Sequence, residues 1–182
     1  MSRELRLNEK IKVTENEGKT VTVLTLEDCE KYHGLKRCGG LALCFRVMKF
    51  ALDRLVPEGE TARRKLITFK TAFDGPGITD SAELVGRCVT RRRFMALPTD
   101  GLEAPECIWG KLYFEVGYGR RLMKISVRDG IISPEFLAAG RKFYSGTATP
   151  QETEIWIGFK GRLYDAVVNS KLEDILKTEI VG

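Results

Sequence analysis

The sequence has few of the features that mark secreted or membrane proteins. Its five cysteines, at positions 29, 38, 44, 88 and 107, include no CxxC pair, and its first residues form no apolar signal segment. An odd number of scattered cysteines does not make a disulfide scaffold, so we expect reduced thiols in a cytoplasmic protein. No apolar run reaches the roughly 18 residues that a membrane span needs, so no membrane partner is expected.

The sequence also has little histidine and only a small net charge. The chain has one histidine, His33, and a net charge of only +5. A basic excess of this size usually just solvates the surface. Basic residues cluster at Lys36 and Arg37, and at Arg87 with residues 91–93. These clusters leave anion or nucleic-acid binding open as a third function, but no stacking aromatics alternate with the arginines, so nucleic acid is not an expected partner.

The length of 182 residues suits one domain, or one domain with an extension. The sequence contains no internal repeat and no low-complexity linker. Its patterns divide the chain into a polar amino-terminal segment at 1–19, a core at 20–147 and a carboxyl-terminal extension at 148–182.

The core is organised around a long helix that follows a glycine pair. Apolar residues recur there at steps of three and four, at Leu41, Cys44, Phe45, Met48, Leu52 and Leu55. Only a narrow polar strip remains, formed by Arg46, Lys49 and Asp53. This pattern predicts a central helix that is covered on two sides.

Segments of alternating hydrophobicity predict strands around this helix. They lie at 20–24, 66–73, 94–97, 111–116 and 122–127. A tight turn joins the last two. Shorter helices are expected from position 25 to the histidine loop, at 80–85 and at 134–140. The predicted fold class is therefore α+β, with a central buried helix packed on a mostly antiparallel sheet.

The carboxyl-terminal extension has an ambiguous pattern. Thr149 and Glu152 have the form of a helix capping box, but the glycines after them would each cost a helix about 1 kcal/mol. We therefore expect a hairpin with strands at 154–159 and 162–168, and a helix is the alternative. A second capping pair, at positions 170 and 173, predicts a final helix that reaches about position 180.

Three side chains with metal-binding chemistry lie beside the ends of expected helices. Cys38 immediately precedes the central helix, where free N–H groups and the helix dipole favour a thiolate. His33 lies five positions upstream, and Cys88 follows the helix expected at 80–85. An imidazole and two thiolates suit zinc, with water or a fourth ligand completing the tetrahedron. The predicted ligands of a zinc or similar divalent ion are therefore His33, Cys38 and Cys88.

The other cysteines and two acidic residues have simpler interpretations. Cys44 lies on the apolar face of the central helix, so we expect it to pack in the core. Either Cys29 or Cys107 could supply a fourth ligand, or neither. Asp80 or Glu83 could act as a general base beside a metal, but their spacing favours a pair that caps the start of a helix.

Several segments also match motifs of one known family. Its opening motif corresponds to Tyr32, His33, Gly34, Cys38, Gly40, Leu41, Ala42, Leu43, Phe45 and Arg46. A second motif, Asp-Ala before a helix that ends in Gly-Cys, is similar to the segment from Asp80 to Cys88. A third is similar to Gly110, Lys111 and Phe114. Over residues 30–130 the chain thus resembles the FmdE family, which is named after a component of formylmethanofuran dehydrogenase.

The chain departs from this family in several ways. The spacing from His33 to Cys38 is one residue longer than usual. A second histidine, usually two places after the first, is Leu35 here, and a cysteine usually three places before the aspartate is Gly77. The zinc-ribbon extension with paired CxxC motifs is absent.

The resemblance implies an accessory metal-binding protein with an α+β fold. Redox or dehydrogenase subunits would then be its partners, and the chemistry of carbon dioxide reduction would reside in them. Whether the chain is itself an enzyme stays open, because a zinc ion with an open coordination position could also activate water or a substrate. Apolar residues around Trp156 predict a homodimer.

Overall fold

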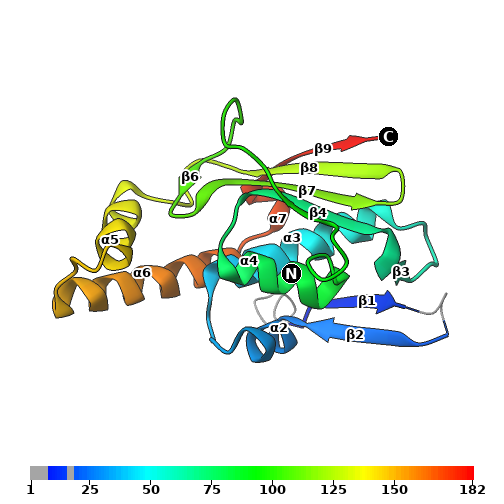
Figure 1. The fold of residues 1–182 in the computed structure, drawn as a ribbon, viewed down its shortest axis with the longest axis horizontal. Helices are drawn as coiled ribbons and strands as arrows, with labels where there is room; N and C mark the ends of the chain where they lie inside the picture. The colour runs from blue at the N-terminus through cyan, green and yellow to red at the C-terminus, as the bar shows by residue number, and fades with distance from the viewer. Residues whose placement is uncertain (1–7, 16–18) are drawn as a thin grey trace.

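The protein has a mixed α+β fold, confirming the predicted class (Figure 1). The computed structural model describes residues 8–15 and 19–182. In these ranges the helices are α2 (Leu26–His33), α3 (Gly39–Leu55), α4 (Pro76–Gly86), α5 (Pro134–Tyr144), α6 (Pro150–Asn169) and α7 (Leu172–Ile175), with a 3-10 turn η1 (Arg64–Leu66).

The strands form two mostly antiparallel sheets. The smaller sheet has the order β2 (Val21–Thr25), β1 (Lys10–Thr14) and β3 (Ala62–Arg63). The larger sheet has the order β5 (Phe94–Ala96), β4 (Ile67–Phe73), β7 (Gly110–Tyr118), β8 (Arg121–Val127) and β9 (Leu176–Val181), and β6 (Glu106–Cys107) pairs with β7. Only the β1–β3 and β4–β5 pairs are parallel among the described strands.

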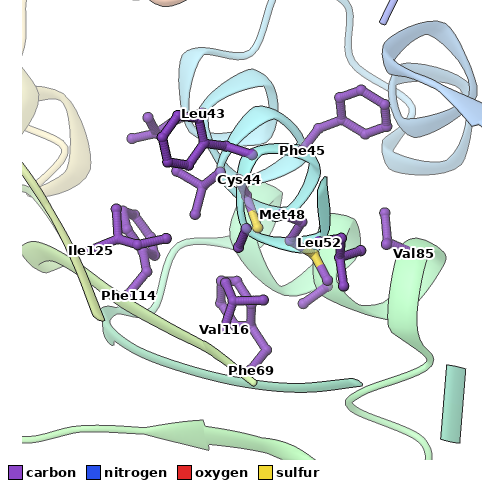
Figure 2. Packing of buried hydrophobic residues seen from close by; sticks show 14 of the residues in the cluster. Leu43, Cys44, Phe45, Met48, Leu52, Phe69, Val85, Phe114, Val116 and Ile125 are labelled. Atoms are coloured by element: carbon purple, nitrogen blue, oxygen red, sulfur yellow. The ribbon is translucent and has the colours of Figure 1, made fainter. Parts of the chain in front are cut away.

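The core lies between α3 and the larger sheet. Leu41, Cys44, Phe45, Met48 and Leu55 have no exposed surface. Figure 2 shows side chains of α3 together with buried residues of β4, β7 and β8. The helices α4 and α6 pack on other faces of α3. The periodicity of its apolar residues therefore predicted the central helix correctly.

The smaller sheet contains a strand that the sequence interpretation missed. In β1, Ile11 and Val13 are buried between exposed lysines, which is the alternation of a half-buried strand. The predicted strand that follows pairs with it as β2. The polar segment at 1–19 thus contributes to the fold, although its residues 1–7 and 16–18 lie outside the described residues.

Two helices extend beyond their predicted ends. The helix α4 begins at Pro76, because proline lacks only an N–H that would have no partner in the first turn. The prediction that Asp80 and Glu83 cap this helix is therefore wrong. The helix α5 is capped as predicted but continues through Gly140, where the packing leaves no room for a side chain.

The carboxyl-terminal extension is a helix where a hairpin was predicted. The prediction of strands at 154–159 and 162–168 is wrong, and the alternative prediction of a helix is confirmed, because both ranges belong to α6. Thr149 and Glu152 form the capping box that opens this helix. Burial of side chains such as Trp156 against α5 and α3 offsets the cost of its internal glycines.

The final helix predicted from position 170 is wrong beyond its first turn, and so is its predicted cap, because Ser170 ends α6 and α7 begins after Lys171 without a side-chain cap. The helix α7 ends at Ile175, and the chain continues as β9. This strand pairs antiparallel with β8, with Leu176 opposite Val127 and Val181 opposite Leu122. The edge of β8 would otherwise present unpaired N–H and C=O groups, so strand pairing outweighs the local helical pattern.

The apolar surface around Trp156 is smaller than the sequence suggested. Trp156 is only 2 % exposed and packs against Phe136 and Phe143 of α5. The homodimer stays a prediction, and the exposed apolar residues beside Trp156 are Ile155 and Ile157. Among the described residues, no helix combines the length and the apolar character needed to cross a membrane.

Candidate functional site

His33 is the last residue of α2, and a residue of α4 fixes its ring. Its Nδ1 lies 2.7 Å from Oδ2 of Asp80. The side chain of His33 is 9 % exposed and that of Asp80 is 37 % exposed. An ionised carboxylate can only accept a hydrogen bond, so Nδ1 carries the proton and Nε2 of a neutral ring keeps its lone pair. Carboxylates orient metal-binding and proton-accepting imidazoles in this way.

Cys38 is the N-cap residue of α3, as predicted, and its side chain lies against the start of α4. Its thiol makes no capping hydrogen bond. A methyl group added at Gly77 would lie 3.1 Å from Sγ of Cys38 and 2.9 Å from the backbone nitrogen of Leu41. Because Gly77 has no side chain, the starts of the two helices can touch, and the thiol lies at their contact.

The helix α4 brings His33 and Cys38 together. Gly77 lies beside Cys38, and Asp80 binds His33. Residues three apart on a helix are neighbours on one face, with Cβ atoms about 5–6 Å apart. Both His33 and Cys38 also line a single cavity. Two of the three predicted metal ligands therefore share a site.

Cys88 lies away from this site. It follows the other end of α4, where its Sγ is 2.5 Å from the position that a methyl group at Gly86 would take. Gly86 is nine residues beyond Gly77, a rise of about 13.5 Å, so the sulfur atoms of Cys38 and Cys88 are at least roughly 8 Å apart. Two thiolates on one zinc ion are at most about 4.6 Å apart. The structure therefore does not assemble His33, Cys38 and Cys88 as one ligand set.

The buried thiols are held in their neutral form. Burial raises the pKa of Cys88 to about 12 and the pKa of Cys29 to about 12. It also raises the pKa of Cys107 to about 11 and puts the pKa of Cys44 well above its ordinary value. The thiolate is the metal ligand and the nucleophile, so these four cysteines are poorly suited to either role. Cys44 packs in the core, as predicted.

A cavity of about 460 Å³ opens beside His33 and Cys38. The starts of α3 and α4 contribute to its walls, together with residues of α5, α6 and β6. Its aromatic lining residues are Phe73, Trp109, Phe136, Tyr144 and Trp156. Small-molecule sites have volumes of about 300–1,000 Å³ and mostly apolar walls. A second cavity, of about 360 Å³, lies between β1 and the end of α3, and no His or Cys among the described residues lines it.

Glu83 and one arginine near Cys88 have structural roles. Glu83 accepts hydrogen bonds from the backbone N–H groups of Val89 and Thr90. Burial opposes the ionisation of Glu83, but the hydrogen bonds from Thr90 and Val89 outweigh it and lower the pKa of this carboxyl. Arg93 donates to backbone carbonyl groups, including that of Gly86. Glu83 therefore caps the loop that follows α4, and Arg93 links the same loop to the end of α4.

Asp80 is a site residue that local sequence reasoning weighed as a general base beside a metal but assigned to a helix cap. Its spacing from Glu83 suggested a helix cap, whereas the resemblance to FmdE had already pointed to this aspartate. In residues 8–15 and 19–182, no group of three or more His, Cys, Asp and Glu side chains is placed to hold a metal ion. Any ion bound by His33 and Cys38 would therefore need further ligands from outside this set of side chains.

Comparisons with known proteins give no family assignment. No protein-family profile matches the chain, and no curated protein matches it significantly. The function therefore has to be argued from the site.

Proposed function

We propose that this protein is an FmdE-like accessory binding module, in which His33 and Cys38 hold a zinc-type ion beside the cavity. The observation that carries the proposal is the arrangement on α4. Asp80 fixes the ring of His33, and one turn earlier Gly77 lies beside Cys38. An oriented imidazole and a thiol at a helix start are both good zinc donors.

The donor set fits a zinc ion in part. His33 and Cys38 would supply two ligands of a tetrahedral ion, and the other two positions would face the cavity or a partner. Such an ion would supply Lewis acidity to a ligand or to water bound there. Cys88 is not a ligand in this proposal, because its sulfur lies beyond the reach of an ion bound at Cys38.

The place of Gly77 supports the relationship to FmdE. The family usually has a cysteine at this position, three residues before the aspartate. Here the position adjoins the sulfur of Cys38, and the aspartate, Asp80, binds His33. A ligand set of that family would therefore converge on the same place, with one thiol lost in this chain.

Metal analysis of purified variants tests this proposal. The wild-type protein should bind one zinc ion, and Cys38→Ser and His33→Ala should each lose most of it. Cys88→Ser and Cys44→Ser are matched controls, since both remove a buried thiol that does not line the cavity. The sequence alone predicts loss of metal in Cys88→Ser, whereas the proposed site predicts retention. Unchanged zinc in both Cys38→Ser and His33→Ala would exclude the site.

The alternative proposal is a small zinc-dependent enzyme. It is favoured by the two coordination positions that remain open beside a cavity large enough for a substrate. The zinc-loaded chain would then hydrolyse an activated ester faster than its Cys38→Ser variant. Equal rates would exclude the enzyme and leave the accessory role. An accessory protein should also show no formylmethanofuran dehydrogenase turnover when it is isolated.

A further inference from the structure

The cavity beside His33 and Cys38 is lined by positive charge without any negative charge. Its lining residues include Lys36, Arg37 and Lys160, and none of them is Asp or Glu. Arg37 pairs with Asp165, at 2.6 Å between Nη2 and Oδ2. Within the described chain, Lys36 and Lys160 have no carboxylate partner. A concave surface with one sign of charge and apolar walls attracts a ligand of the opposite sign.

Two helix starts add to this positive potential. The helices α3 and α4 both begin in the cavity wall, at Cys38 and Gly75, and neither has a side-chain cap. The helices α2, α5 and α6 begin elsewhere, and each is capped by a Ser or Thr side chain. The uncapped start of α3 presents free N–H groups and the positive end of the helix dipole, a combination that binds anions. The start of α4 contributes mainly its dipole, because Pro76 has no N–H and the N–H of Ile78 donates to the carbonyl of Gly75.

A buried donor without a partner belongs to a residue of the same wall. Trp156 lines the cavity and is 2 % exposed, and its Nε1 is buried with no hydrogen-bond partner among the described residues. An indole N–H can only donate, and a buried donor without an acceptor is costly. Because this N–H has almost no accessible surface, an acceptor oxygen of a bound molecule would satisfy it only after the indole ring shifts.

We infer that the cavity binds a small aromatic carboxylate. The ring would lie among the aromatic side chains of the wall, including Phe73 and Trp109. The carboxylate would interact with the helix starts, Lys36, Lys160 and the N–H of Trp156. This inference rests on the proposed function for the location of the site, and it names the class of ligand, but it does not require zinc.

Three isosteric probes test the inference on the metal-free protein. These are 2-naphthoate, the neutral 2-naphthamide and the cationic 2-naphthylmethylammonium. Both tryptophans of the chain line the cavity, so binding can be followed by quenching of their fluorescence. Two helix starts and two lysines should make naphthoate bind about fivefold or more tightly than naphthamide, with the ammonium weakest. The preference should shrink as salt is raised.

Variants locate the carboxylate. Lys160→Gln and Lys36→Gln should each reduce the preference for naphthoate over naphthamide, whereas Lys124→Gln, on β8, should leave it unchanged. Trp156→Phe keeps an aromatic ring but removes the donor, so it should weaken naphthoate more than naphthamide, as measured by calorimetry. Equal binding of the three probes would overturn the inference and leave the zinc site standing. Absence of binding by all three at millimolar concentration would also overturn it, while metal analysis decides the proposed function separately.

Discussion

Replacing Gly77 by alanine tests the contact on which the candidate site depends. The added methyl group would lie 2.9 Å from the backbone nitrogen of Leu41 and 3.1 Å from Sγ of Cys38. Backbone at that distance cannot rotate away, so the starts of α3 and α4 would have to separate. Overpacking of this kind costs about 1–3 kcal/mol, and the gain in helix propensity returns at most about 1 kcal/mol.

The expected net loss is therefore about 1–2 kcal/mol of unfolding free energy. For a protein of this size each kcal/mol changes Tm by about 2–4 °C, so Gly77→Ala should unfold several degrees below the wild type. Gly158→Ala is the matched control. Gly158 lies inside α6, where the nearest atom to an added methyl group is the flexible end of Arg162, at 3.4 Å. This change should stabilise the protein by up to about 1 kcal/mol.

Thermal unfolding followed by circular dichroism measures both variants, and zinc content provides a second measurement. Because Gly77→Ala pushes the start of α3 away from α4, it should also reduce bound zinc, whereas Gly158→Ala should not. An unfolding temperature for Gly77→Ala at or above that of the wild type would refute the close contact. The placement of Cys38 beside α4 would then be wrong as well.

Three further predictions concern the core, the metal and the thiols. Arg46→Met should cost about 3–5 kcal/mol in urea unfolding, because it leaves the partly buried carboxylate of Glu9 and two carbonyl groups unpaired, whereas Lys49→Met should cost less than about 1 kcal/mol. Asp80→Asn should lower zinc affinity about 10–100-fold by replacing the carboxylate that orients the histidine ring with a neutral amide, as zinc titration would measure, and Glu83→Gln should not. Burial raises the pKa of Cys88 to about 12, above the ordinary thiol pKa of 9.0. Its contribution to stability is fully present below pH 9.0, and it is lost as pH rises toward about 12, because the thiol then ionises more readily in the unfolded chain. Unfolding free energy should therefore drop less between these pH values in Cys88→Ala than in the wild type, and parallel pH profiles would contradict this.

Periodicity alone was sufficient to predict the elements whose own residue pattern shows which faces are buried. The helix α3 was predicted because its apolar residues cover two faces, whatever they pack against. The same holds for β7 and β8, which alternate strongly and are joined by a short turn at Gly119. Local patterns did not predict the secondary structure of segments whose conformation depends on packing partners. The residues of α6 fit a hairpin or a helix, and packing on α3 and α5 selected the helix.

Arg46 and β9 show what tertiary contacts add to such patterns. The sequence analysis placed Arg46 in the narrow polar strip of the central helix, but Arg46 is 2 % exposed and hydrogen-bonded to both carboxylate oxygens of Glu9. That partner is 37 residues away, so no local pattern could reveal it. The residues of β9 carry helical spacing, yet they complete the sheet, because the edge of β8 offers a ladder of backbone hydrogen bonds.

Residue chemistry and local spacing were enough to select the candidates for a site, namely His33, Cys38 and Cys88. They were also enough to put Cys38 at the start of the central helix. Which of these residues meet depends on how the helices pack, because local spacing does not fix the distance between residues on different loops. Gly77 and Asp80 lie one turn apart on one face of α4, where they meet Cys38 and His33, and Cys88 follows the far end of this helix.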